Sequence, residues 1–300
     1  MAPILSINNI LKSYGAVQAL KGVSFDVPEG SVFGVLGPNG SGKTTLLAIL
    51  LDVLKADSGS YEWFGGIDYA AARKQIGALL ETPNFYHYLS AVKNLEINAR
   101  IKQRGEDDIA RVLDIVRLTQ RKDSKFSSYS LGMKQRLAIA NALLGKPKVL
   151  LLDEPTNGLD PEGIAEIREL IIALNQQGIT VIMASHLLDE VEKVCTHVAV
   201  LKRGELLVSG RVGDAFQSED LLEIAAADMV ALQASLAQMQ GIKNINLQGK
   251  ILIAFLQENT TVEDVNRYCF QNGITLTHLI LRKKSLESQF MELTKGGSIH

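Results

Sequence analysis

The stretch GPNGSGKTT, residues 37–45, has the residue types and spacing of a phosphate-binding loop, G-x-x-x-x-G-K-[S/T]. It follows an apolar run that predicts a strand and opens a run that predicts a helix. Glycines let backbone N–H groups turn towards phosphate oxygens, and the helix N-terminus adds positive potential. We expect Lys43 to reach the β- and γ-phosphates and the Thr44 hydroxyl to bind Mg²⁺. The nucleotide-binding residues predicted here are Gly37, Asn39, Gly40, Ser41, Gly42, Lys43, Thr44 and Thr45.

Two adjacent carboxylates end a second apolar run, VLLLDEP. Asp153 follows four apolar residues of a predicted buried strand, a position that suits a ligand of Mg²⁺ or of its water shell. Glu154 comes one residue later, where a carboxylate can orient or deprotonate the water that attacks a γ-phosphate. Two acids at the end of a strand are usually a solvated cap. The phosphate loop upstream favours the catalytic interpretation.

A histidine ends the next predicted strand, VIMASH. His186 therefore belongs at the same carboxyl edge of the sheet as Asp153, and open α/β sheets bind ligands along that edge. A lone histidine before a helix is more often a cap or a satisfied polar residue. Its position at the end of a strand favours a role at the nucleotide site instead.

The elements that must position these residues follow from the pattern of apolar residues. Residues 4–33 alternate apolar and polar positions and predict a meander of short antiparallel strands. Buried strands separated by helices then predict a mostly parallel sheet, with one helix over 44–56 and another from Asp160 to near Gly178. Residues 84–146 are helical and charged, which indicates a helical insertion, and VAVLKRGELLVSG predicts a closing hairpin.

The last part of the chain changes character near residue 218. Its pattern predicts strand, helix, hairpin, helix and strand, the βαββαβ order of a ferredoxin-like domain. We therefore expect an α/β domain over residues 1–218 and a small α+β domain over 219–300.

Composition restricts the partners of the chain. Thirty-one basic and 33 acidic residues leave a formal charge of -2, so a broad nucleic-acid footprint is not expected. Cys195 and Cys269 match no metal-binding spacing. The uncharged stretch 170–188 is cut by NQQG, and it predicts a helix, a turn and a strand rather than a membrane span.

Four motifs in this order, GPNGSGKTT, SLGMKQRLAIA, VLLLDEPTNGLDP and ASH, resemble the ATPase subunit of an ATP-binding-cassette (ABC) transporter over residues 1 to about 215. The resemblance is to cassettes of the bacitracin-resistance and drug-export type. It implies a P-loop ABC ATPase fold, the substrate ATP, the cofactor Mg²⁺ and a head-to-tail homodimer.

In that family, each signature helix points its N-terminus at the γ-phosphate held by the other subunit. Ser130 and Gly132 stand in the signature position, where a hydroxyl and a small residue suit an approaching phosphate. Leu131 and Met133 replace the usual glycine and glutamine. The alternative for Ser130 is a plain N-cap of its own helix.

The resemblance implies further roles. Tyr14 matches the aromatic residue that stacks on adenine, although it also suits the core of a hairpin. Asp160 matches the loop that crosses the dimer interface, or else caps the following helix. His186 matches the residue that contacts the γ-phosphate. Glu81 replaces the usual glutamine of the nucleotide-sensing loop, where a carboxylate could ligate Mg²⁺ or its water.

A cluster of aromatic residues follows Glu81, in the sequence NFYHYL. By resemblance, the segment from Glu81 to Leu89 contacts a short cytoplasmic helix of a transmembrane permease subunit. We expect the cluster of Phe85, Tyr86, Tyr88 and Leu89 to form half of the socket for that helix. Local packing under the helical insertion is the alternative.

The implied function is ATP-driven transport, favouring export of a drug, peptide or lipid, by a subunit peripheral to the cytoplasmic face of the membrane. A soluble cassette acting in translation or DNA repair is the alternative function, and the C-terminal domain could be a dimerisation module or a sensor.

Overall fold

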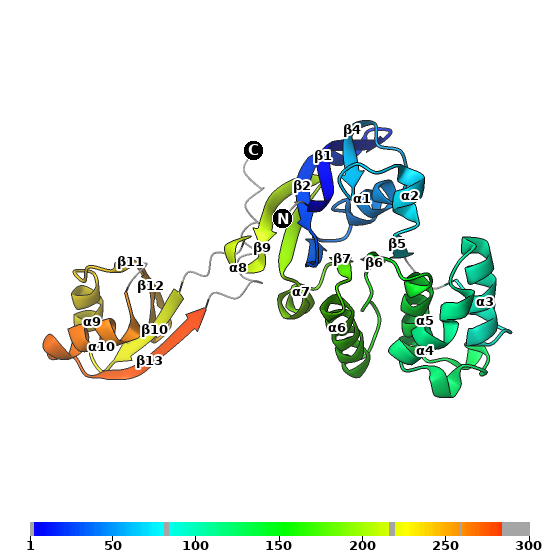
Figure 1. Ribbon diagram of the computed structural model, residues 1–300. Coiled ribbons are helices and arrows are strands. Elements are labelled where there is room, and N and C mark those ends of the chain that lie inside the picture. The colour runs from blue at the N-terminus through cyan, green and yellow to red at the C-terminus, as the bar shows by residue number, and fades with distance from the viewer. Residues whose placement is uncertain (1–2, 81–83, 216–219, 258–259, 284–300) are drawn as a thin grey trace. The chain divides into compact units, whose positions relative to one another are not determined.

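The computed structural model describes residues 3–80, 84–215, 220–257 and 260–283 (Figure 1). The chain divides into two compact units, residues 1–215 and 216–300. This division lies three residues before the boundary expected from the sequence. Each unit has its own hydrophobic core and is described by itself below.

An antiparallel sheet forms the N-terminal part of the first unit. Its strand order is β2-β1-β4, and the strands are β1 (Pro3–Tyr14), β2 (Val17–Pro28) and β4 (Ser58–Trp63). The predicted antiparallel pairing is present, but the prediction of short strands was wrong because β1 and β2 each run for 12 residues. Shifts in the β1–β2 register, one of them around Asn9 with its left-handed φ of 50°, let two long strands stay paired while they twist.

A six-stranded sheet forms the centre of the first unit. Its order is β5-β6-β7-β3-β8-β9, and only the β8–β9 pair is antiparallel. The strands are β3 (Val32–Leu36), β5 (Ile76–Leu79), β6 (Val149–Asp153), β7 (Thr180–Ser185), β8 (His197–Lys202) and β9 (Glu205–Arg211). Every residue of β3, β6 and β7 is buried, as expected for parallel strands covered on both faces. The predicted mostly parallel sheet is confirmed.

Helices flank this sheet (Figure 1). They are α1 (Lys43–Leu50), α2 (Tyr69–Arg73), α6 (Pro161–Gln176), α7 (Leu188–Val194) and α8 (Val212–Ala215). The helix after the phosphate loop was expected to continue to residue 56, and this was wrong. It ends at Leu50 because Asp52 adopts a left-handed φ of 60°, which turns the chain away from the helix axis.

The strand register brings the candidate residues to one edge. Asp153 pairs with Ala184 on β7, and Ala184 pairs with Val35 on β3. Two residues after Val35 the phosphate loop begins. Since neighbouring strands lie about 4.8 Å apart, the end of β6 and the start of this loop are within about 10 Å of each other across the sheet.

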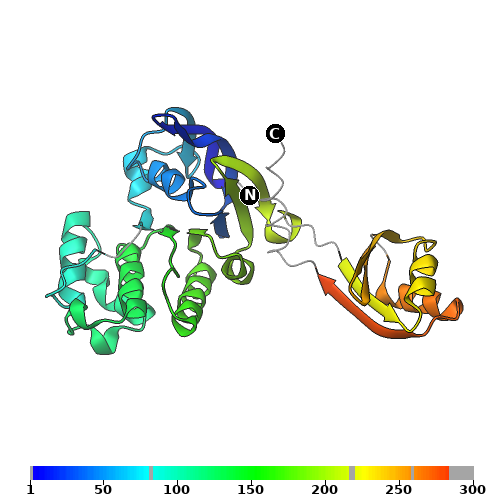
Figure 2. The ribbon, with the colours of Figure 1, turned by 180° about the vertical axis from the view of Figure 1, so that it is seen from behind.

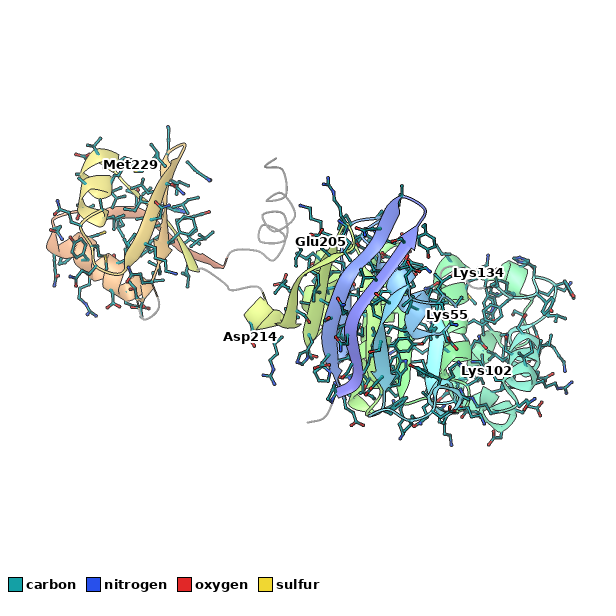
Figure 3. The ribbon with its side chains drawn as sticks, turned by 90° about the horizontal axis from the view of Figure 1, so that it is seen from above. Lys55, Lys102, Lys134, Glu205, Asp214 and Met229 are labelled. Atoms are coloured by element: carbon teal, nitrogen blue, oxygen red, sulfur yellow. The ribbon has the colours of Figure 1, made fainter. Side chains whose placement is uncertain are left out.

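The helical insertion contains α3 (Ala91–Lys102), α4 (Ile109–Ile115) and α5 (Leu131–Leu143), all within the predicted range 84–146. These helices lie together at one side of the six-stranded sheet (Figures 1 and 2), and Figure 3 labels Lys102 and Lys134 on them. Asp108 holds the insertion to the end of α5 by accepting hydrogen bonds from Arg111 at 2.5 Å and from the Gly145 N–H at 3.2 Å. These contacts fix the position of α5, and with it that of the N-terminus of α5, within the insertion.

The second unit has the predicted βαββαβ order. Its elements are β10 (Asp220–Ala226), α9 (Met229–Leu236), β11 (Ile242–Gln248), β12 (Ile251–Leu256), α10 (Val262–Gln271) and β13 (Leu276–Lys283). The antiparallel strand order β11-β12-β10-β13 is that of a ferredoxin-like fold. Both helices pack on the same face of this sheet, around Ile224, Leu252 and Val265 (Figures 1 and 3). Within the described residues, none of the helices combines the length and the apolar character that crossing a membrane requires.

Candidate nucleotide-binding site

A cavity of about 730 Å³ opens at the carboxyl edge of the six-stranded sheet. Its walls come from the tip of the β1–β2 hairpin, the phosphate loop, the end of β6 and the β8–β9 turn. The lining residues are Tyr14, Ala16, Val17, Gln18, Ala19, Lys21, Asn39, Gly40, Gly42, Lys43, Thr44, Thr45, Glu154 and Arg203. Six of the eight residues predicted in the phosphate loop therefore face one cavity.

The glycines of the phosphate loop are required by its backbone. Gly42, immediately before α1, has a φ of 106°, and a Cβ there would lie 2.5 Å from the Ala19 carbonyl oxygen. Gly40 has a left-handed φ of 78°. The Oγ of Ser41 is buried and has no hydrogen-bond partner among the described residues. A tightly turned loop that leads into a helix N-terminus matches the shape and polarity of a nucleotide's phosphate groups.

Lys43, Glu154 and His186 form a connected set. The Lys43 Nζ donates a hydrogen bond to the Gly37 carbonyl oxygen at 2.8 Å and lies 3.4 Å from Oε1 of Glu154. The other carboxylate oxygen, Oε2, lies 2.8 Å from Nδ1 of His186. Glu154 has a left-handed φ of 48°, and its N–H donates to the Ala184 carbonyl oxygen, so the backbone turns sharply just after β6. The structure thus joins three residues that come from separate motifs.

The predicted Mg²⁺ ligands come from two elements. Thr44 stands in the first turn of α1 and lines the cavity, while Asp153 is the buried last residue of β6. Among the described residues, no group of three or more His, Cys, Asp and Glu side chains could hold a metal. A hydroxyl and a carboxylate nonetheless fit Mg²⁺, which takes oxygen ligands and commonly uses one or two protein groups beside phosphate and water. Glu81, the third predicted ligand, lies outside the described residues.

Tyr14 lies on the cavity wall and not in the core of the hairpin. Its side chain is 48 % exposed, and the Lys12 Nζ lies 5.8 Å from the centre of its ring. An exposed ring at the rim of a cavity offers a flat face for a nucleobase. The geometry therefore favours the stacking role over the packing role.

The signature residues lie around a second depression, of about 410 Å³. Ser130, Gly132 and Asp160 line it, and none of them lines the first cavity. Ser130 caps α5 by accepting a hydrogen bond from the Met133 N–H at 3.3 Å, and Asp160 caps α6 by accepting one from the Gly163 N–H at 3.0 Å. Ser130 and Asp160 therefore both act as N-caps, and the N-termini of α5 and α6 face the same depression.

The aromatic segment after Glu81 divides into a packed part and an exposed part. The ring of Phe85 packs on buried Phe126, with 5.1 Å between ring centres. Tyr86 and Tyr88 are 50 % and 68 % exposed, and their rings lie 6.0 Å apart. Buried Asn94 fixes the segment by accepting from the Tyr86 N–H at 2.8 Å and donating to the Tyr86 carbonyl oxygen at 3.2 Å. Local packing thus accounts for Phe85 but not for the two tyrosines.

Two cations at the cavity were missed by reasoning from the sequence. Lys21 of β2 and Arg203 of the β8–β9 turn both line the first cavity. The alternating pattern around LKRGEL predicts a hairpin and its turn. This local pattern does not indicate that the turn lies beside the phosphate loop, because the turn and the loop are about 160 residues apart in the chain.

Comparison with known proteins gives concordant matches. A sequence model of the family described as ABC transporter matches residues 20–157. The ABC transporter ATP-binding protein YdbJ of Bacillus subtilis (strain 168) is 37% identical, covering 97% of this chain and 96% of its own. The bacitracin transport ATP-binding protein BcrA of Bacillus licheniformis is 35% identical over 100% of both chains. A structure of the dimeric cassette MJ0796 in a post-hydrolysis state, bound to ADP and Pi, is 28% identical, with a TM-score of 0.61, and covers 69% of this chain and 98% of its own.

Proposed function

The chain belongs to the family of ABC transporter ATP-binding proteins, and from this premise we propose that it hydrolyses MgATP in the 730 Å³ cavity to drive a separate transmembrane subunit. The observation that carries the proposal is the contact of Lys43 and His186 with the two oxygens of one carboxylate, Glu154, beside a phosphate loop. A cation that can bind phosphate, Lys43, thus lies beside a candidate general base, Glu154.

Each residue of this set has a distinct task in the proposed reaction. Lys43 and the loop N–H groups bind the phosphates and offset their negative charge. Glu154 accepts a proton from, or orients, the water that attacks the γ-phosphate. His186 holds Oε2 of Glu154 at 2.8 Å and so limits the directions in which the carboxylate can point. Tyr14 stacks on the adenine.

The metal site is proposed on the same grounds. Thr44 and Asp153 would hold Mg²⁺, which would offset the negative charge that develops on the phosphates. Asp153 is suited to this task because the end of β6 places it at the level of the phosphate loop.

The second depression supports a head-to-tail homodimer. Ser130 and Gly132 face a hollow separate from the cavity of their own chain, so we propose that they bind the γ-phosphate held by a second copy. The dimeric state of the MJ0796 cassette supports this arrangement. Binding of MgATP between two copies would supply the contacts that favour the closed state.

The proposed cargo follows from relatives that act in transport. BcrA of Bacillus licheniformis is named for bacitracin transport. We therefore place this chain at the cytoplasmic face of the membrane, in export of a drug, peptide or lipid. The cargo itself would be selected by the membrane subunit.

Replacing Lys43 by Ala tests nucleotide binding. Removal of a buried ammonium that belongs to the phosphate site is expected to weaken MgATP binding at least about tenfold, since charge-assisted hydrogen bonds are among the strongest in proteins. Isothermal titration with MgATP measures the effect, and Lys55→Ala is the control, because Lys55 is exposed and does not line the cavity. Equal ATP affinity of the Lys43 variant and the wild type would remove the basis of the proposal.

Replacing Tyr86 and Tyr88 by Ala tests the contact with the membrane subunit. Because both rings are exposed and the segment is fixed through backbone bonds to Asn94, the double variant should fold normally. Coexpressed with its transmembrane subunit, the double variant should lose most of the stimulation of ATPase activity by that subunit. Phe85→Ala should instead lower the thermal midpoint, because Phe85 packs on Phe126. Unchanged stimulation in the tyrosine variant would exclude this socket.

We propose that the second unit is an accessory module and not part of the ATPase. Every residue that lines the nucleotide cavity lies in the first unit, which has its own core. A chain ending at residue 215 is therefore expected to bind MgATP within about twofold of the full chain, as separate sites usually contribute independently. Light scattering of both forms with MgATP would show whether the module strengthens the dimer. Loss of ATP binding on truncation would overturn the proposed independence.

A further inference from the structure

Two of the three cations that line the nucleotide cavity, Lys21 and Arg203, have no task in the proposed reaction, and Lys21 already has a carboxylate partner in Glu205. Arg203 lines this cavity with Tyr14, Lys43 and Glu154, although it comes from the turn between β8 and β9. We propose that Arg203 binds a phosphate oxygen of the nucleotide and so raises the affinity of the cavity for nucleoside di- and triphosphates. This inference rests on the proposed nucleotide function, and the experiment below separates the two.

The turn that carries Arg203 is fastened to the phosphate loop. The N–H of Gly204 donates to the Ser41 carbonyl oxygen at 3.0 Å, and the Gly204 carbonyl oxygen accepts from the Lys21 N–H at 2.8 Å. At the other end of the loop, a Cβ on Gly37 would lie 2.3 Å from the Leu201 carbonyl oxygen. The hairpin therefore touches the loop at both ends, and the position of Arg203 relative to the phosphate site is fixed by backbone contacts.

The backbone conformation of Arg203 is one that arginine disfavours. Lys202 pairs with Glu205, so Arg203 and Gly204 alone form the turn, and their φ angles are 48° and 83°. Two positive φ values in a two-residue hairpin are typical of a type I′ turn, for which Asn-Gly is the favoured pair. An arginine that adopts this left-handed conformation beside a binding site, in place of the favoured asparagine, indicates that its side chain has a function there.

The charges around the cavity leave Arg203 available for an anion. Three cations line the cavity, and two have carboxylate partners: Lys21 lies 2.9 Å from Glu205, and Lys43 lies 3.4 Å from Glu154. For Arg203, which is exposed at the rim, the described residues include no ion-pair partner. Arginine's planar set of donors matches the oxygens of a phosphate better than it matches a nucleobase that itself carries donors.

The variant Arg203→Asn provides a test in which binding and stability should change differently. It removes the guanidinium and creates the Asn-Gly pair that suits the turn, so the thermal midpoint of the ligand-free protein should stay equal or rise. The dissociation constants of ATP and ADP should increase about tenfold, since a charge-assisted contact is lost. Arg203→Lys retains the positive charge but not the paired donors of the guanidinium, so the loss of affinity for ATP and ADP should be smaller, about threefold.

Two comparisons identify the contact. Lys202→Ala removes a positive charge from the adjacent residue, which is half-buried and does not line the cavity. It should leave ATP affinity within about twofold, because solvent and salt screen a charge that makes no contact with the ligand. Inorganic tripolyphosphate, used as a competitor of ATP, has no base or sugar. Its affinity should fall in Arg203→Asn by the same factor as that of ATP.

The inference fails if Arg203→Asn binds ATP as the wild type does, or if Lys202→Ala loses as much affinity as Arg203→Asn. It also fails if ATP is weakened while tripolyphosphate is not, because the contact would then be to the base or ribose. In each of these outcomes the wild type still binds MgATP and Lys43→Ala binds it more weakly, so the proposed function stands. A wild type that does not bind MgATP would refute both.

Discussion

A Glu154→Gln protein is expected to hydrolyse ATP at least about a hundredfold more slowly than the wild type while it still binds ATP, because removal of a general base typically costs a factor of that size. The amide has nearly the shape of the carboxylate but cannot accept the proton of the attacking water. It also removes a negative charge 3.4 Å from the Lys43 Nζ, so the affinity for MgATP should be equal or higher. The rate of hydrolysis should therefore fall while the affinity for MgATP does not.

The same variant should accumulate as an ATP-bound dimer. Steady-state phosphate release measures the rate, titration measures the affinity, and light scattering with MgATP measures the mass. Glu169→Gln, which neutralises an exposed carboxylate on α6, is the control and should keep the wild-type rate. Turnover near the wild-type rate in Glu154→Gln would exclude Glu154 as the base.

A Gly132→Asp protein is expected to lose hydrolysis by about a hundredfold or more, because a negative charge would stand where stabilisation of the γ-phosphate is proposed. A Cβ at Gly132 would meet nothing within 4 Å, so the substitution should not disturb the fold of the chain. Gly132 does not line the cavity of its own chain, so ATP binding by a single subunit should change little. The predicted defect is therefore in hydrolysis by two subunits.

Mixing two inactive variants tests whether the signature acts on the other subunit. A mixed dimer of Lys43→Ala and Gly132→Asp would contain one site with both substitutions and one site with neither. ATPase activity should therefore return when the two proteins are combined. If the mixture stays as inactive as its components, Gly132 acts within its own chain and the head-to-tail arrangement is wrong.

Local patterns in the sequence were sufficient for much of this protein. The glycines and Lys43 predicted the phosphate loop, and the apolar run before Asp153 predicted a buried strand. Both signals depend on residues adjacent in the chain, which decide backbone conformation and burial directly. The confirmed family and fold class followed from the order of such motifs. Strand lengths and the end of α1 were predicted less well, because bulges and a left-handed Asp52 depend on neighbouring strands and turns.

By itself, the sequence determined which residues could bind phosphate, bind a metal ion or accept a proton, because these properties belong to the side chain and its immediate neighbours. Only the tertiary structure decided which of them meet. It joined Lys43 to Glu154 and His186, separated the packed, half-buried Phe85 from the exposed Tyr86, and brought Arg203 to the cavity. These contacts depend on sheet register and on the packing of a hairpin against the phosphate loop, and such long-range pairings leave no periodic trace along the chain.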